Sequence, residues 1–408
     1  MRIWEWAVRT SLLSTAVLIV PGPTLAQEVD PAQNALFRVG PLALTPALSV
    51  PAAGLDSNVY NESEQPRKDF VADVQPQVDA WLRLGRLRVD GKQQFNYLYF
   101  NRYVSERALN TMSTISGEVD LLWVKPHASV GFLKAKDRPD ARIDTRAVHR
   151  SHMASAGLDF RLSSSTSVDL AGSLNDTAFD RGATFGSTSL QAALDRETRR
   201  YQGTLRYNVT APTTLTVNVT RQEERFRYTP QQDSSSLRLL PGVAFAADSI
   251  VTGDLQVGWI SFKPQSATLR PFKGVVAGGS LGYVFFGVTR FQLSVLRDVT
   301  PSIDKDATYA LQTGLTGTVT HRVSERWDVN ASASRLRMDF GEIRPLTDTD
   351  STIDRADRVV TYAGGIGFYF TRGLRIGVRA ESVKRDSVQA INRYDNLRIL
   401  SSISYTRQ

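Results

Sequence analysis

The residue types that usually carry enzyme chemistry are scarce in this chain and are not arranged as a site. Its 408 residues include four histidines and no cysteine, which excludes a disulfide scaffold, a cysteine nucleophile and a thiolate metal site. His149 and His152 lie three residues apart without carboxylates in register, so we expect polar residues beside a loop rather than metal ligands. Runs of three serines, at 163–165 and 234–236, are typical of turns. We therefore predict no enzyme: no catalytic residue, no metal and no cofactor.

The charged residues alternate with apolar residues along the chain. In the segment 374–381, Leu, Ile, Val and Ala fall on one face while Arg and Glu fall on the other. The same alternation occurs at 87–92, 215–220 and 291–295, and a period of two indicates β-strands with one apolar and one polar face. The net charge of +8 comes from 49 basic and 41 acidic residues that are interspersed, so we predict no nucleic-acid partner.

Short and long connections alternate between these segments. Eight short links, such as the one at 85–86, and nine longer polar links, such as 54–68, join eighteen predicted strands. This rhythm is typical of an all-β, transmembrane, antiparallel up-and-down β-barrel with short turns on one rim. Sixteen strands is the alternative, because the stretch 236–262 has the weakest pattern.

The N-terminus has the features of a secretory signal. Arg2 and Arg9 give the N-terminus a basic start, and small residues precede Gln27. The apolar run at 11–20 between them is too short to span a bilayer. We predict a signal peptide over 1–26, a short periplasmic segment over 27–40 and an outer-membrane barrel over 41–408. The mature chain then has 47 basic and 40 acidic residues, a net charge of +7.

In this topology the polar faces line a lumen that is hydrated and carries both signs of charge. The predicted lumen-lining residues are Asp73, Asp79, Arg88, Asp90, Lys92, Asp169, Asp254, Arg297, Arg375, Arg379, Glu381 and Arg398. Aromatic residues near the short turns are expected to form a girdle at the periplasmic interface with outer-membrane lipid. They are Trp81, Trp123, Tyr207, Tyr283, Trp327, Phe368, Phe370 and Tyr405.

Three positions depart from the pattern. Pro76 removes a ladder donor inside a predicted strand and indicates a local irregularity or bulge. The apolar phase slips between Ala333 and Leu336, which indicates another bulge. The chain ends at Gln408 rather than at an aromatic residue, with Tyr405 in its place. The barrel assembly machinery remains an expected partner.

The N-terminal part of the mature chain also resembles a known family. The run Phe37–Pro46, followed by Asp56–Tyr60, Asp69-Phe70 and Gln75-Pro76, resembles the opening of the outer-membrane β-barrel porin 2 type. The resemblance implies a barrel associated with exopolysaccharide or capsular polysaccharide export, and a periplasmic polysaccharide-export protein as partner. A general or solute-specific diffusion porin, and a structural barrel that anchors a periplasmic complex, are the alternatives.

Overall fold

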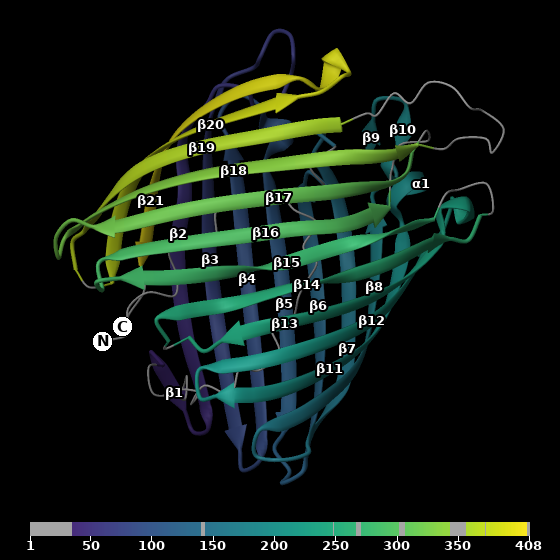
Figure 1. Ribbon diagram of the computed structural model, residues 1–408. Helices are drawn as coiled ribbons and strands as arrows, with labels where there is room; N and C mark the ends of the chain where they lie inside the picture. Colours follow the sequence, from purple (N-terminus) through teal and green to yellow (C-terminus); the bar gives the residue numbers. More distant parts are fainter. Residues whose placement is uncertain are drawn as a thin grey trace.

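The chain folds as a closed antiparallel β-barrel of eighteen strands in the computed structural model (Figure 1). The structure describes residues 35–139, 143–247, 249–266, 271–301, 307–342, 356–371 and 373–405. The predicted signal peptide lies outside these residues. The eighteen-strand prediction is confirmed, and the sixteen-strand alternative is not.

The N-terminal part of the chain forms the short strand β1 and the first seven barrel strands, β2 to β8. They are β1 (Phe37–Val39), β2 (Leu42–Asp56), β3 (Asp69–Leu84), β4 (Leu87–Phe100), β5 (Ala108–Val119), β6 (Val124–Asp137), β7 (Ala147–Arg161) and β8 (Thr166–Phe179), where β1 is a short addition to the barrel. The loop after β8 contains β9 (Thr184–Phe185), β10 (Thr188–Ser189) and α1 (Leu190–Leu194).

Eleven further strands complete the barrel. They are β11 (Arg196–Thr210), β12 (Thr213–Phe226), β13 (Ser234–Phe245), β14 (Val251–Pro264), β15 (Phe272–Phe285), β16 (Thr289–Pro301), β17 (Ala307–Arg322), β18 (Trp327–Glu342), β19 (Ala356–Tyr369), β20 (Leu374–Asp386) and β21 (Tyr394–Tyr405). Short 3₁₀ turns occur at Val104–Glu106, Pro230–Gln232 and Ala390–Asn392. Among the described residues, no helix is long and apolar enough to cross a membrane.

The barrel closes where β2 pairs with β21, from Leu48↔Tyr405 to Asp56↔Arg398. Beyond the last pair with β21, the start of β2 pairs with β1 as a hairpin. Part of 27–40, which was predicted as a short periplasmic segment, is therefore a strand. At Gly54 in this seam, an added Cβ would lie 2.0 Å from the Ile399 carbonyl oxygen. Only glycine allows the two backbones to approach this closely.

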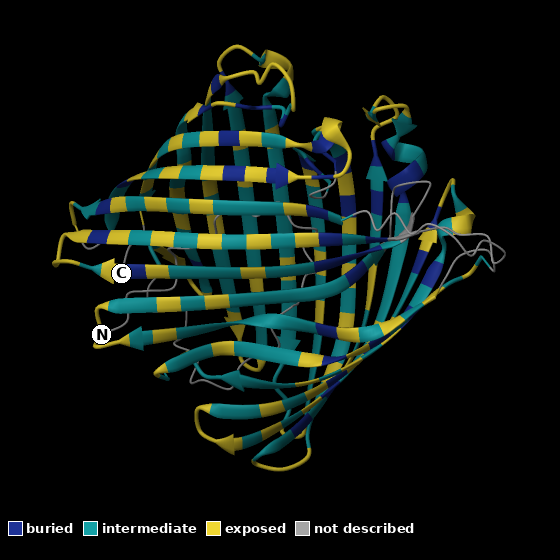
Figure 2. Ribbon diagram, turned by 45° about the horizontal axis from the view of Figure 1, so that its top comes forward, coloured by how far each residue is buried: buried dark blue, intermediate teal, exposed yellow. Residues whose placement is uncertain are grey.

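Links between strands alternate as the sequence predicts. Every second link, eight in all, has two to five residues, and these eight define one rim of the barrel, which we call the short-turn rim. The other links define the long-loop rim, and the longest of them is 180–195. Exposed and less exposed residues alternate along the strands, and most buried residues lie toward the long-loop rim (Figure 2).

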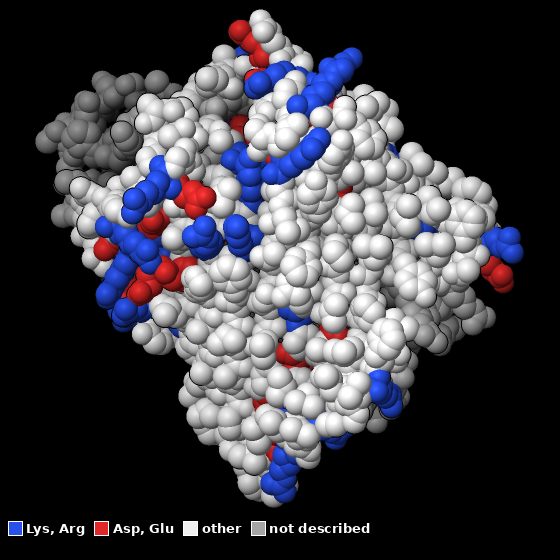
Figure 3. Space-filling model, turned by 180° about the vertical axis from the view of Figure 1, so that it is seen from behind, with Lys and Arg blue, Asp and Glu red and all other residues white. Residues whose placement is uncertain are grey.

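The outer surface between the rims is largely uncharged. Seen from behind, most charged side chains gather toward the two ends of the barrel, and a broad, mainly uncharged surface with a few charged atoms lies between them (Figure 3). Outward residues include Leu293, Leu315 and Val378, which are about half exposed. An apolar band between charged margins fits the hydrocarbon layer of a membrane.

The two expected irregularities have different outcomes. Beside Pro76, the register shifts between Ser49 and Ala52, so the extra residue lies in the facing strand β2 rather than in β3. The bulge predicted over Ala333–Leu336 was wrong, because β18 pairs continuously with both neighbours there. Leu336 faces inward, where it packs against an apolar cluster that includes Met338.

Candidate functional site

Strand alternation places eleven of the twelve predicted lumen residues on the inward face. The exposed apolar residues of each strand, such as Val78 on β3 and Phe95 on β4, mark its outward face. The residues directly before and after each of them in the strand therefore point inward. The inward set comprises Asp73, Asp79, Arg88, Asp90, Lys92, Asp169, Asp254, Arg375, Arg379, Glu381 and Arg398.

Arg297 is the exception, because it has the same phase as the exposed Phe291 and Leu293 of β16 and therefore faces outward. The β15–β16 ladder ends at its pair with Ala277. The Arg297 guanidinium donates from Nε to the Val275 carbonyl at 3.1 Å and from its Nη1 to Thr313 Oγ1 at 3.0 Å. It therefore donates a hydrogen bond to a backbone carbonyl that lies beyond the end of the ladder. The alternation of residue types along the sequence could not reveal this contact.

Trp81 also differs from its prediction. It lies three residues after the outward Val78 and opposite Ala43 and Asp90, so it faces the lumen and not the lipid. The period of two from Asp73 through Asp79 was a usable signal for this phase.

The remaining residues of the predicted girdle lie at or beside the short-turn rim. Trp123, Tyr207, Tyr283, Trp327, Phe370 and Tyr405 are exposed, and the Phe368 ring contacts the Trp327 ring at a centroid distance of 4.7 Å.

The inward faces of β3 and β4 form a continuous polar strip, which we call the polar track. Its members are Asp73, Gln75, Gln77, Asp79 and Trp81 on β3, and Arg88, Asp90, Lys92, Gln94 and Asn96 on β4. The Asp73 carboxylate accepts hydrogen bonds from Asn96 Nδ2 at 2.7 Å and Gln75 Nε2 at 2.9 Å. From Asp73 to Trp81 the track is about 26 Å long at the usual strand rise of about 3.3 Å per residue. It therefore extends along most of the apolar band.

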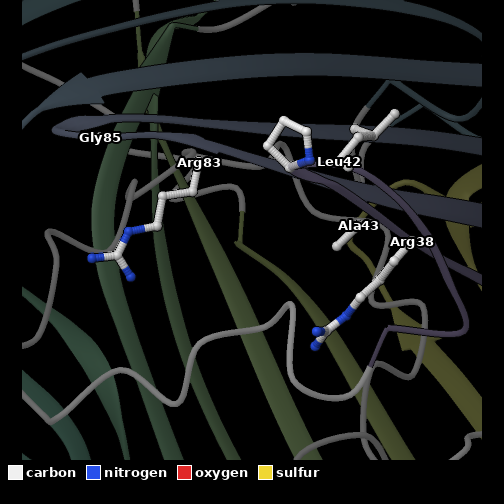
Figure 4. A pocket seen from close by; sticks show the side chains of 7 residues that line it. Arg38, Leu42, Ala43, Arg83 and Gly85 are labelled. Atoms are coloured by element: carbon white, nitrogen blue, oxygen red, sulfur yellow. The ribbon is translucent and has the colours of Figure 1, made fainter.

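At the short-turn rim the polar track begins beside a small pocket (Figure 4). The pocket has a volume of about 500 Å³ and is lined by Arg38, Arg83, Ala43 and the backbone around Gly40 and Gly85. Arg38 is paired with Ala43, which is paired in turn with Trp81, so these three residues share one face. Figure 4 shows the Arg38 and Arg83 side chains extending to the same side of the strands.

A second aromatic residue lies at this rim on another part of the wall. Tyr369 faces inward with Arg322 and Arg375, whose guanidinium carbons are 5.5 Å and 5.9 Å from its ring centroid. Arg375 also donates two hydrogen bonds to the Asp328 carboxylate, at 2.7 Å and 2.6 Å. Asp328 is almost fully buried, so this bidentate pair fixes the guanidinium.

Further ion pairs lie on the inward face near the seam where β2 pairs with β21. Arg398 on β21 donates to Glu381 on β20 at 3.1 Å and to Asp56 on β2 at 3.1 Å. Arg379 lies 3.2 Å from Glu381. These charges therefore bind the first and last strands of the barrel to each other.

The Asp56–Tyr60 motif organises the loop at this seam. Asn58 is buried, and its backbone amide donates to Asp56 Oδ1 at 2.9 Å and to Asn396 Oδ1 at 3.1 Å. Its side chain donates to the Glu62 carbonyl and accepts from the Glu62 amide. Burial raises the pKa of Tyr60, whose ring lies 3.9 Å from the Arg67 guanidinium carbon. The motif thus joins both ends of the barrel at the long-loop rim.

The described residues of the link between β6 and β7, which are 138, 139 and 143–146, reach this motif. Arg138 and Arg146 both donate to the Val59 carbonyl, at 2.9 Å and 3.2 Å. Burial lowers the pKa of Arg138 to about 10, with the nearby positive charge of Arg146 as a second cause. Burial also lowers the pKa of Arg146.

Asp144 extends the loop's contacts to the far side of the seam. Its carboxylate accepts from Asn61 Nδ2 at 2.8 Å and from Arg385 on β20 at 2.9 Å. Arg385 is completely buried and also donates to Asp357 at 2.7 Å. Since β6 and β20 lie on separate parts of the wall, the contacts of Asp144 and Arg146 reach across part of the mouth and narrow it.

A second loop, 180–195, packs beside the first. Leu190 and Leu194 of α1 form a buried cluster with Ile143, Ala147 and Phe179. Ala147 and Phe179 are inward positions of β7 and β8, so α1 lies on the lumen side of these strands. Sequence reasoning assigned both loops only as exposed connections.

The histidines do not form a metal site. His149 faces inward 3.5 Å from Asp137, and His127 lies 2.8 Å from Asp169. Within the described part of the chain, no group of three or more His, Cys, Asp or Glu residues could hold a metal ion. Of the acidic loop residues from Asp348 to Asp357, only Asp357 is described, and it is bound by Arg385 and Ser387.

The fold and the polar, charge-paired interior define an outer-membrane β-barrel of the porin-like channel class. The chain belongs to the family described as "Putative beta-barrel porin 2", whose model matches residues 30–407. No curated protein shows significant sequence similarity to it.

Three solved structures are similar to this chain. The outer membrane protein opdK from Pseudomonas aeruginosa has 10% identity and a TM-score of 0.47, covering 89% of this chain and 98% of its own. A BenF-like porin from Pseudomonas fluorescens Pf-5 has 9% identity and a TM-score of 0.47, covering 89% and 99%. OprD from Pseudomonas aeruginosa has 7% identity and a TM-score of 0.46, covering 88% and 94%.

Proposed function

We propose that this barrel conducts exopolysaccharide or capsular polysaccharide out of the cell without catalysis. The observation that carries the proposal is the polar track with Trp81 at its short-turn end. Carboxylates and amides can exchange hydrogen bonds with sugar hydroxyls, and an aromatic ring offers an apolar face to a pyranose ring. An extended polymer could therefore move along the wall while it exchanges one set of weak contacts for the next.

The orientation follows from the class of barrel, whose short turns face the periplasm. Trp81 and the pocket of Arg38 and Arg83 then lie at the periplasmic entrance, where a polymer would arrive. A periplasmic polysaccharide-export protein is the partner that we propose at this rim. The signal peptide over 1–26 remains part of the proposal for how the chain reaches the outer membrane.

Deletion of the gene in its source bacterium tests the proposal. We expect surface polysaccharide to be lost while permeability to small solutes changes little, and a copy carrying Trp81→Ala should restore export only partly. The matched control is Trp259→Ala, because Trp259 faces outward and is 63% exposed. A normal amount of surface polysaccharide in the deletion strain would contradict the proposal.

A diffusion porin is the second candidate, because eighteen strands enclose a lumen wide enough for water and small solutes. Swelling of liposomes that contain the purified barrel separates the two functions. Rapid entry of monosaccharides would favour the porin, whereas slow entry with retained polymer export would favour the conduit.

A further inference from the structure

We infer that the outward face of the barrel binds a lipid of the outer leaflet through the phosphate groups of its headgroup. The site is a cluster that we call the cationic patch, which consists of Trp259, Lys263, Lys273 and Arg297. The inference goes beyond the proposed conduit function and does not depend on it, because the patch lies on the lipid-facing side of the wall.

Three neighbouring strands, β14, β15 and β16, carry the patch (Figure 1). Trp259 faces outward opposite Val275, and Lys273 is opposite Ser261, the next outward position of β14. Lys263 is the outward position after that, so both lysines lie between Trp259 and the long-loop rim. Both are exposed, and diagonal positions on paired strands are about 7–8 Å apart. One headgroup can therefore contact both ammonium groups.

Arg297 adds a third positive charge on the β16 side of the patch. Its Nε donates to the Val275 carbonyl at 3.1 Å, and its Nη1 donates to Thr313 Oγ1 at 3.0 Å. Both acceptors are neutral oxygens, so these bonds hold the guanidinium in place without neutralising its charge. Since Val275 is opposite Trp259, the guanidinium and the indole belong to one continuous part of the outward face.

The patch has no acidic neighbour on this part of the wall. Among the described outward positions of β13 to β17 there is no Asp or Glu. Asp254 and Asp298 face inward, and Asp298 pairs there with a lumen arginine at 3.2 Å. Elsewhere on the outward face, basic residues have acidic partners on their own strand, as Arg221 has Glu223 at 2.9 Å. A positive charge that is not paired in this way therefore distinguishes the patch.

The position of the patch along the barrel matches the headgroup level of a membrane. At the usual rise of about 3.3 Å per residue, Lys273 lies about 40 Å along β15 from Phe285 at the short-turn end. A strand tilt of about 40° reduces this to a height of about 30 Å, whereas the apolar band of such barrels is about 25 Å tall. The lysines therefore lie just beyond the hydrocarbon, and Trp259 lies below them at the interface, where indole rings are favoured.

The chemistry of the patch fits a phosphorylated headgroup. Phosphate oxygens accept charge-assisted hydrogen bonds from ammonium and guanidinium groups, and basic clusters at a membrane surface attract anionic lipids. The exposed Trp259 ring offers an apolar contact to the acyl chains directly below that headgroup. Three cations match a lipid that carries two phosphates better than a zwitterionic lipid, whose own amine competes for its single phosphate.

Lipid binding to the purified full-length barrel tests the inference. Native mass spectrometry from detergent micelles measures the affinity for lipid A, which carries two phosphates, and for zwitterionic phosphatidylethanolamine. We expect lipid A to bind at least tenfold more tightly. The variant Lys263→Gln with Lys273→Gln should weaken lipid A binding about tenfold, because two basic contacts at the membrane surface are lost. Both side chains are exposed, so the variant should fold normally, which its heat-modifiable band in gel electrophoresis checks.

The matched control is Lys134→Gln with Lys384→Gln, which removes the same charge from exposed outward positions of β6 and β20. Its affinity for lipid A should stay within about twofold of the unmodified protein. Equal binding of the two lipids, or an unchanged affinity in the patch variant, would overturn the inference. An equal loss in the control would also overturn it, since attraction would then be spread over the whole margin. Displacement of lipid A by inorganic phosphate alone would likewise overturn it, because the site would then take the free anion.

Discussion

Replacing Asp144 by asparagine should loosen the loop that narrows the mouth. The Asp144 carboxylate is 2.9 Å from the buried guanidinium of Arg385 and accepts from Asn61 at 2.8 Å. An asparagine keeps the size of the side chain but removes its charge. Arg385 keeps its partner Asp357, so the β20 side of the network should remain folded.

The size of the effect follows from the contact that is lost. A hydrogen bond to a charged group contributes about 1.5–3 kcal/mol, and we take about 2 kcal/mol for this one because both groups are largely buried. That value changes the ratio of seated to displaced loop about thirtyfold. Arg138 and Arg146 still hold the loop to the Val59 carbonyl, so the seated form persists as one of two states.

Single-channel recording of the purified barrel in planar bilayers measures this change. We expect Asp144→Asn to occupy a state of higher conductance for a larger fraction of the time than the unmodified protein. The control Glu223→Gln removes a carboxylate from an exposed ion pair with Arg221 on the outer wall. Exposed pairs contribute little, so its conductance should not change. If Asp144→Asn folds normally and its conductance distribution matches that of the control, the assigned role of the loop is refuted.

Three further predictions concern the barrel wall. Gly54→Ala should prevent closure of the barrel, because the added Cβ would lie 2.0 Å from the Ile399 carbonyl oxygen. The heat-modifiable band of the folded barrel in gel electrophoresis should then disappear. The control Gly91→Ala should keep this band, because the atom nearest to its added Cβ is 3.6 Å away. Arg375→Gln should lower the free energy of unfolding by about 3 kcal/mol because it leaves Asp328 buried without its bidentate partner. Urea titration should show partial recovery when Asp328→Asn is added, and no recovery would contradict the pairing. Trp327→Ala should cost about 1 kcal/mol in the same titration through loss of its contact with Phe368, and an unchanged midpoint would exclude that contribution.

Much of the barrel follows from local sequence alone. The period of two places Leu374 and Ile376 outward and Arg375 inward because successive strand residues must point to opposite faces. Short turns at 85–86 and 211–212 are just long enough to reverse an antiparallel strand, so they locate one rim. The family resemblance likewise depends on short runs of neighbouring residues near the N-terminus.

Local sequence failed where the environment of a residue depends on distant strands. Arg297 has the composition of a lumen residue, but its phase in β16 and the end of the β15 ladder direct it outward. Trp81 has the composition of a girdle residue, but its register with Ala43 and Asp90 turns it inward. A side chain's type shows what it can bind, whereas the register of its strand determines which solvent it meets.

The sequence by itself therefore determined the number of strands, their order and the alternation of rims, because these depend on neighbours in the chain. Only the tertiary structure decided how the mouth is built. Asp144 meets Arg385 across 241 positions of sequence, and Asp56 meets Arg398 across 342. Such contacts exist only after the first and last strands pair, because closure of the barrel is what brings these charges within hydrogen-bond distance.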